Sequence, residues 1–204
     1  MPEIEYFYST HSAFAYLGSA KLQEVAAKHG RSIRHRPVLL RPLLEAMKSP
    51  AFSIRTPQQL AYFFHREIDR WAEFREAPTL GYIPKTHASP IELSSGLVIA
   101  AIRAGHSADA LAHEMLSRHW QDDADLADRE TLAKIATSVG LDPGLLDLAM
   151  SEDIQAELQD NTREAAERSV FGSPTYFVDG DMFYGQDRLE MVDRALSKPF
   201  APSK

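Results

Sequence analysis

The sequence predicts an α/β protein in which a strand–helix–strand unit and a strand–strand–helix unit are separated by a large, all-helical insertion. Three observations lead to this prediction. The first 40 of the 204 residues pass from a strand-like run to a helical period and back to an extended run. Residues 41–169 then have a helical pattern almost throughout, and residues 170–204 return to short strands and one amphipathic helix. We therefore expect one domain, residues 1–40 and 170–204, that carries an inserted helical subdomain, residues 41–169.

The first unit begins with Ile4–Ser9, which is aromatic and β-branched and suits a buried strand. Ser12–His29 has apolar residues at helical spacing, and Gly30 supplies the stop. Arg31–Leu40 is extended in pattern. A strand–helix–strand unit of this length predicts a right-handed crossover between two parallel strands.

The insertion contains several candidate helices, and many of them begin with residues that are favoured at helix starts. The candidates are Pro57–Glu76, Pro90–Ala104, Ser107–Trp120, Arg129–Val139, Pro143–Met150 and Glu152–Arg168. Most aromatic residues of the first candidate fit a packed core, and Tyr62 and Phe64 are candidates to border a cleft.

The last unit starts with a strand, Thr175–Val178, followed by the tight hairpin turn Asp179-Gly180. Met182–Tyr184 is the returning strand. Gly185–Arg188 then leads into a final amphipathic helix that carries Leu189, Met191, Val192 and Leu196.

The composition excludes several classes of function. The chain has no cysteine, which excludes a disulfide framework, a redox pair, a thiolate metal site and a cysteine nucleophile. Any sulfur chemistry therefore needs a ligand that brings the sulfur. The net charge of −7 argues against nucleic acid as the main partner. The histidines lack metal-ligand spacing, so no metal is expected.

Neither a membrane span nor a secretory signal is visible. A span needs about 20 apolar residues, and residues 1–10 lack a basic start followed by an apolar run. We therefore expect a cytoplasmic protein that does not interact with membranes.

Three motifs resemble those of the 2-hydroxychromene-2-carboxylate isomerases and kappa-class glutathione transferases. Phe7–Gly18 is similar to the opening strand and helix start of that family, Phe171–Gly180 to its cis-proline strand, and Phe183–Leu189 to the turn that follows. Asp69–Ala72 also matches a recurrent helix of the family. The resemblance implies a thioredoxin-like fold (βαβ–ββα) with a DsbA-like helical insertion, and glutathione as the cofactor.

Ser12 is the candidate catalytic residue. It lies where the first strand ends and the first helix begins, beside unpaired backbone N–H groups and the positive end of the helix dipole. A thiol placed there would be favoured as thiolate. Local sequence alone favours a helix-capping role for this serine. The resemblance implies that its hydroxyl donates a hydrogen bond to the sulfur of glutathione.

Ser173, Pro174, Gln186 and Asp187 are the candidate glutathione-binding residues. The resemblance implies a cis bond at Ser173-Pro174, which presents the Ser173 backbone to the cysteinyl unit like an added strand. Local sequence predicts a trans bond, since only about 5–6% of X–Pro bonds are cis. The resemblance assigns the γ-glutamyl end to Gln186 and Asp187, whereas local sequence makes Asp187 the N-cap of the last helix.

Arg41 and Lys48 are the candidate cations for a substrate carboxylate or for the glycyl end of glutathione. His11 directly precedes Ser12 and is either an acid or base or, as local sequence favours, an exposed linker histidine. The chain departs from the family at two places. Ala13 follows Ser12 where proline is usual, and Ser49–Arg55 occupies the position of an asparagine–x–proline–proline segment whose asparagine contacts glutathione in the family.

The resemblance implies a glutathione-dependent isomerase that converts 2-hydroxychromene-2-carboxylate, or a similar aromatic-degradation intermediate, to trans-o-hydroxybenzylidenepyruvate by reversible thiolate addition. The expected partners are a small aromatic substrate and a second copy in a homodimer. One alternative is a kappa-like glutathione transferase or peroxidase, in which glutathione is consumed and is not released again as it was. Another is a non-catalytic thioredoxin-fold protein that binds extended peptides at the cis-proline edge.

Overall fold

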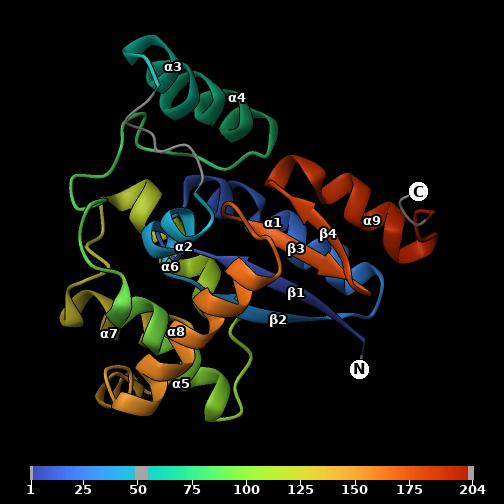
Figure 1. Cartoon of the computed structure of the whole chain (residues 1–204). Coiled ribbons are helices and arrows are strands. Elements are labelled where there is room, and N and C mark those ends of the chain that lie inside the picture. The colour runs from blue at the N-terminus through green and yellow to red at the C-terminus, as the bar shows by residue number, and fades with distance from the viewer. Residues whose placement is uncertain (1, 49–54, 202–204) are drawn as a thin grey trace.

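A four-stranded mixed sheet in the order β2-β1-β3-β4 forms the centre of the protein (Figure 1). The structure is a computed structural model, and it describes residues 2–48 and 55–201. β1 pairs parallel with β2 and antiparallel with β3, and β3 pairs antiparallel with β4. The strands are β1 (Glu3–Tyr8), β2 (Ser32–Pro37), β3 (Thr175–Val178) and β4 (Asp181–Tyr184).

Both faces of the sheet are buried, and the alternation of side chains along the strands divides the aromatic residues between them. In the register of β1, Tyr6 lies opposite His35 in β2 and Tyr176 in β3. The rings of Tyr6 and Tyr176 stack on one face, 5.4 Å apart between centroids. Phe7 and Phe177 are buried on the other face.

Two helices cover each face of the sheet (Figure 1). α1 (Ala13–Lys28) and α9 (Leu189–Ser197) share the core that contains Tyr6. α2 (Leu40–Ala46) and α8 (Glu152–Glu167) contact one another, and their apolar side chains pack with Phe7. The predicted order of a βαβ unit and a ββα unit separated by helices is confirmed.

The segment between β2 and β3 is helical and has a core of its own, formed mainly by α5 to α8. Figure 1 shows α3 and α4 at one end of the molecule, apart from the cluster of α5, α7 and α8. The division of the chain into one domain, residues 1–40 and 170–204, and an inserted helical subdomain, residues 41–169, stays a prediction. The remaining elements are α3 (Pro57–Ala61), the π-helix η2 (Tyr62–Arg66), α4 (Glu67–Phe74), α5 (Glu92–Arg103), α6 (Asp109–Asp122), α7 (Arg129–Ser138) and the 3₁₀-helix η3 (Pro143–Asp147).

Three expected elements differ in detail from the structure. The single helix expected over Pro57–Glu76 is a continuous run that ends at Phe74 and contains one π-helical turn, which apolar periodicity does not reveal. The helix expected over Pro143–Met150 is the short 3₁₀-helix η3. The extended run that was expected to reach Leu40 ends at Pro37, since Leu40 is the first residue of α2.

The predicted hairpin turn is confirmed. Asp179 and Gly180 both have positive φ, 50° and 92°, as a two-residue turn of type I′ requires. No helix within the described ranges is long and apolar enough to cross a membrane.

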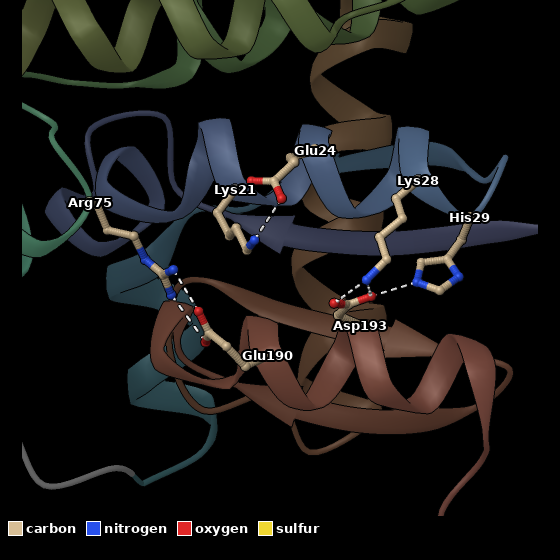
Figure 2. Close-up of polar contacts among 7 residues, drawn as sticks. All are labelled: Lys21, Glu24, Lys28, His29, Arg75, Glu190 and Asp193. Atoms are coloured by element: carbon tan, nitrogen blue, oxygen red, sulfur yellow. Dashed lines mark hydrogen bonds and ion pairs between the residues drawn. The ribbon is translucent and has the colours of Figure 1, made fainter.

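Polar contacts tie α9 to α1 and to the end of α4 (Figure 2). Lys28 and His29, at the end of α1, both contact the Asp193 carboxylate, at 2.7 and 2.6 Å. Arg75, which follows α4, pairs with Glu190 at 2.6 Å. Because α9 follows the turn that carries Gln186, these contacts also fix the position of that turn.

Candidate active site

Ser12 lies at the N-terminus of α1 and touches the loop that precedes β3. Its Oγ accepts a hydrogen bond from the Ala15 N–H and donates one to the Ser173 carbonyl oxygen, both at 3.3 Å. The N-cap role expected from local sequence is therefore confirmed. Both distances are long for bonds of a hydroxyl group, so the Ser12 hydroxyl is only weakly held. It can exchange its acceptor at little cost.

The Ser173-Pro174 peptide bond is cis, as the resemblance implies, and the trans bond expected from local statistics is wrong. Ser173 is half-buried and Pro174 is buried. The Ser9 N–H donates to the Ser173 Oγ at 3.0 Å, and the Gly185 N–H donates to the Pro174 carbonyl at 2.9 Å. The loop before β3 thus lies between the end of β1 and the turn after β4. The Ser173 carbonyl, expected to face a ligand, accepts the bond from Ser12.

Gln186 is buried in the turn between β4 and α9 and is held by Arg75. The Arg75 Nε donates to the Gln186 side-chain oxygen at 3.1 Å, and a terminal N–H donates to its main-chain oxygen at 3.2 Å. Figure 2 shows the same guanidinium reaching Glu190 on α9. Among the described residues, the Gln186 Nε2 has no hydrogen-bond partner although it is buried.

Arg75 is a residue that sequence reasoning missed. It lies at the C-cap of α4, and its side chain is only 8% exposed. Its contact with Gln186 joins residues that are 111 positions apart. The only local signal is a basic residue near the end of a helical pattern, which normally indicates a favourable interaction with the helix dipole and nothing more.

Asp187 is not the N-cap of the last helix, contrary to the expectation from local sequence. The short 3₁₀-helix η4 (Gln186–Arg188) precedes α9, so Asp187 lies inside this turn and Arg188 is at the start of α9. The Asp187 carboxylate contacts Arg188 at 2.6 Å. It also lies over Gly185, where an added Cβ would be 2.4 Å from the Asp187 Oδ1. The carboxylate is half-buried and remains at the same turn as Gln186.

Arg41 and Lys48 are exposed and lie at the two ends of the α2 region. No described contact joins either side chain to Ser12 or to the cis-proline loop. The structure does not describe residues 49–54. Of the segment Ser49–Arg55, which replaces the asparagine–x–proline–proline segment of the family, only Arg55 is therefore described. A substrate-binding role for Arg41 and Lys48 stays a prediction.

His11 belongs to a cluster of three histidines, and the expectation of an exposed linker histidine is wrong. Its half-buried ring lies 4.5 Å from the His87 ring and 6.4 Å from the His119 ring, between centroids. The Trp120 indole N–H donates to the His11 carbonyl at 2.9 Å. No local pattern indicates this cluster, because the three histidines come from separate segments.

The environment of the cluster keeps His11 and His87 uncharged at neutral pH. Burial, with the neighbouring imidazoles adding to it, lowers the pKa of His11 to about 3 and that of His87 to about 4. A histidine with so low a pKa is a weak base. Within residues 2–48 and 55–201, no group of three His, Asp or Glu side chains is arranged to hold a metal ion.

A groove of about 480 Å³ lies on α3 and η2. Tyr62 lines it, whereas Phe64 packs against the core. The groove also involves Phe63, whose ring is 5.1 Å from the ring of Phe14. Phe14 is in the first turn of α1, two residues after Ser12, so one residue of the groove contacts the start of α1.

Residues 3–197 match the family model for the DSBA-like thioredoxin domain. The chain belongs to this family. The predicted thioredoxin-like fold is confirmed with it.

The chain is similar to proteins that are named for two different activities. It is 28% identical to the 2-hydroxychromene-2-carboxylate isomerase of Sphingobium xenophagum, over 95% of this chain and 97% of that one. A solved 2-hydroxychromene-2-carboxylate isomerase superposes with a TM-score of 0.82 at 22% identity, over 96% of this chain and 94% of that one. The cytosolic disulfide reductase DsbM of Pseudomonas aeruginosa, solved with GSH, superposes with a TM-score of 0.64 at 18% identity, over 97% of this chain and 93% of that one. The predicted resemblance to the isomerases is confirmed.

Proposed function

We propose that this chain is a glutathione-dependent isomerase that acts on 2-hydroxychromene-2-carboxylate or a similar small aromatic intermediate. The observation that carries the proposal is the contact of Ser12, at the N-terminus of α1, with Ser173 of the cis-proline loop, in a chain without cysteine. A thioredoxin-like site that lacks its own sulfur is suited to a thiol brought by a ligand. The isomerase relatives, which align with nearly the whole chain, support the same reaction.

The residues of the site fit glutathione. The half-buried Ser173 main chain can pair with the cysteinyl unit, and the Asp187 carboxylate can meet the γ-glutamyl ammonium group. The Gln186 amide has an unused buried N–H donor, as far as the described residues show. The solved DsbM with GSH supports the choice of this tripeptide. When bound, glutathione supplies a thiol that adds reversibly to the conjugated system of the substrate.

Ser12 and α1 would act on the sulfur of that thiol. The unpaired N–H groups and the dipole of a 16-residue helix favour a negative charge at its N-terminus, which lowers the pKa of a thiol placed there. The Ser12 hydroxyl would donate its hydrogen bond to the sulfur instead of to the Ser173 carbonyl. Because the existing bond is 3.3 Å long, little is lost in this exchange.

Arg75 would act as a positioning residue. Its two hydrogen bonds hold Gln186 and therefore the turn that carries Asp187. We also propose that Arg41 and Lys48 supply positive charge near the substrate, that the protein functions in the cytoplasm, and that it forms a homodimer.

The test follows the absorbance of 2-hydroxychromene-2-carboxylate as it isomerises to trans-o-hydroxybenzylidenepyruvate, with the purified protein and with or without glutathione. We expect acceleration only with both protein and glutathione, and an unchanged glutathione concentration at the end. Consumption of glutathione would indicate a transferase. Absence of acceleration, together with equal binding of glutathione and unrelated tripeptides, would indicate the non-catalytic peptide-binding protein.

A further inference from the structure

Two exposed aromatic side chains lie beside the cis-proline loop. Phe171 is two residues before Ser173 in the chain, and Tyr184 is the last residue of β4. Each residue is 41% exposed, and the centroids of the two rings lie 4.5 Å apart. Adjoining apolar side chains that stay exposed indicate a surface that a ligand or partner covers. This pair therefore indicates a binding surface at the edge of the candidate active site.

Tyr184 lies directly against the loop that contacts Ser12. In the register of β3 and β4 it lies opposite Thr175, the first residue after the cis-proline. Its side chain covers Gly172, where an added Cβ would be 2.8 Å from the Tyr184 hydroxyl oxygen. Gly172 is bonded to Ser173, whose carbonyl oxygen accepts the hydrogen bond from Ser12. The hydroxyl groups of Ser12 and Tyr184 therefore both lie at the residues that precede the cis-proline.

The Tyr184 hydroxyl is a hydrogen-bond donor that the protein itself does not occupy. Within residues 2–48 and 55–201, no hydrogen bond is described for this hydroxyl. Partial burial raises the pKa of Tyr184; the positive charge of Arg55 opposes this rise, and the negative charge of Asp187 adds to it. The hydroxyl therefore keeps its proton at neutral pH and can donate to a ligand.

The addition of a thiolate to a conjugated ketone needs such a donor. The sulfur forms a bond to the alkene carbon beside the aromatic ring, the carbon–carbon double bond becomes single, and an electron pair moves onto the keto oxygen. No proton moves in this step, and elimination of the thiolate reverses it after rotation about the single bond. A donor aimed at the keto oxygen stabilises the negative charge that develops there. Because the Ser12 hydroxyl is assigned to the sulfur, the oxygen requires a second donor.

We propose that the Tyr184 hydroxyl donates a hydrogen bond to the keto oxygen of the electrophilic substrate, while the Phe171 ring packs against the aromatic part of that substrate. Tyr184 is then a second catalytic residue, which acts on the acceptor whereas Ser12 acts on the sulfur. The proposal rests on the proposed function, because the charge on the oxygen arises only when the thiolate adds. It also names the class of substrate: aromatic compounds with a carbon–carbon double bond conjugated to a keto group.

A binding measurement with a probe that cannot add a thiol across a double bond tests this contact by itself. The probe is 4-phenyl-2-oxobutanoate, and 4-phenylbutanoate is its counterpart without the keto oxygen. In calorimetric titrations of the full chain without glutathione, we expect the keto probe to bind about tenfold more tightly. Tyr184→Phe removes only the hydroxyl and should abolish this preference. Tyr82→Phe is the matched control, because Tyr82 is similarly exposed, at 44%, and no described contact joins it to the cis-proline loop.

Equal binding of the two probes to the unchanged protein, or an unchanged preference in Tyr184→Phe, would overturn the proposal. Failure to detect binding of the keto probe would overturn it as well. Gly172→Ala is a second variant: its Cβ should displace the Tyr184 side chain and abolish the preference while the hydroxyl remains present. Phe171→Ala should weaken the binding of both probes by a similar factor, because packing against a ring does not distinguish them.

Kinetics separate this proposal from the proposed function. If the protein isomerises its substrate, Tyr184→Phe should lower kcat about tenfold and leave the Kd for glutathione unchanged. Isomerisation with an unchanged kcat in this variant would overturn the catalytic role of Tyr184 and leave the function standing. Absence of isomerisation together with a Tyr184-dependent preference for the keto probe would support the contact with the keto oxygen and contradict the function.

Discussion

Among single residues, the Ser12 hydroxyl is placed to serve both as a helix cap and as a hydrogen-bond donor. It caps α1 through the Ala15 N–H and bridges to the Ser173 carbonyl. Neither bond is short, and Ser12 is buried, with 8% of the residue exposed. Capping therefore holds the hydroxyl in place while leaving it able to donate to a sulfur atom.

Replacing Ser12 by alanine separates the two roles. For Ser12→Ala we expect turnover to fall about 10²-fold, the range seen when a donor to a developing charge is lost. The free energy of unfolding should fall by only about 0.5–2 kcal/mol, the usual effect of losing an N-cap. Steady-state kinetics and denaturant titration measure the two effects.

The matched control is Asp128→Ala, which removes the N-cap of α7. Asp128 accepts a hydrogen bond from the Thr131 N–H at 2.8 Å, and α7 contributes nothing to the Ser12 site as described above. The control should lose similar stability and keep full turnover. Unchanged turnover in Ser12→Ala would remove Ser12 from the mechanism.

The residues of the site differ in how far sequence could predict them. Ser12, Ser173, Pro174 and Gln186 occur in local motifs at the ends of predicted elements, and the structure brings their segments together. Arg75 could not be predicted, because its function depends on a contact with the turn 111 positions further along the chain. The neighbours of His11 could not be predicted either, since ring contacts between distant segments leave no periodic pattern in the sequence.

At the scale of elements, the turn that carries Gln186 is packed closely between α1 and the end of α4. Gly18 in α1 is the point of closest approach. A Cβ there would lie 2.7 Å from the Gln186 Cβ and 3.1 Å from the Tyr176 hydroxyl. Neither the buried turn nor the helix can move away without disturbing the site.

Gly18→Ala should therefore both destabilise the protein and weaken glutathione binding. Replacing glycine by alanine stabilises a helix by about 1 kcal/mol. The overpacking against Gln186 and Tyr176 destabilises the protein by about 1–3 kcal/mol. We expect a net loss of about 1 kcal/mol in the free energy of unfolding. Calorimetry should also show a higher Kd for glutathione, because Gln186 is displaced.

Gly96→Ala is the matched control for this substitution. A Cβ at Gly96 in α5 would lie within 3 Å of the Ala149 carbonyl, far from the turn of Gln186 in sequence and in another core. This variant should be destabilised while the folded fraction binds glutathione normally. Equal Kd values in Gly18→Ala and the unchanged protein would contradict a glutathione site at this turn.

Arg75 joins α4 to the same turn, and its removal has a predictable result. Arg75→Ala loses two hydrogen bonds to Gln186, so we expect the unfolding free energy to fall by about 1–3 kcal/mol. The Kd for glutathione should rise about tenfold, as measured by calorimetry.

Glu190→Gln is the comparison for Arg75→Ala. It weakens the ion pair to a carboxylate that is 54% exposed, and it leaves the bonds to Gln186 in place. Its effect on stability should be below about 1 kcal/mol. If the two variants bind glutathione equally well, Arg75 has no positioning role.

At the scale of the whole molecule, the sheet was more predictable than the helical segment. Strand-like runs at the two ends of the chain were found because each carries its own local pattern. The parallel pairing of β1 with β2 follows from the helix between them, and the hairpin follows from Asp179-Gly180. The packing of the helices between β2 and β3 could not be predicted, because their apolar faces are similar and their loops do not fix an orientation.

The histidine cluster gives the molecule a predictable response to acid. In the unfolded chain a histidine has a pKa of about 6.5, whereas the pKa is about 3 for His11 and about 4 for His87 in the folded protein. Between these values the unfolded state binds more protons. The contribution of the cluster to stability is therefore fully present above pH 6.5 and falls as the pH drops towards the folded pKa values.

Denaturant titrations between about pH 7.5 and 5 should show this dependence. The slope should approach about 1.4 kcal/mol per pH unit for each of the two histidines. His87→Gln should give a shallower slope, because one titrating group is removed. A stability that does not change with pH over this range, or an equal slope in the variant, would contradict neutral histidines in the cluster.

The central claim is that a thiol brought by glutathione is held as thiolate at Ser12. The most direct measurement is a calorimetric titration of the unchanged protein and of Ser12→Ala with glutathione and with S-methylglutathione. We expect methylation to weaken binding to the unchanged protein, and we expect Ser12→Ala to reduce that difference. Equal affinity of the unchanged protein for both ligands, or no binding at millimolar glutathione, would contradict the claim.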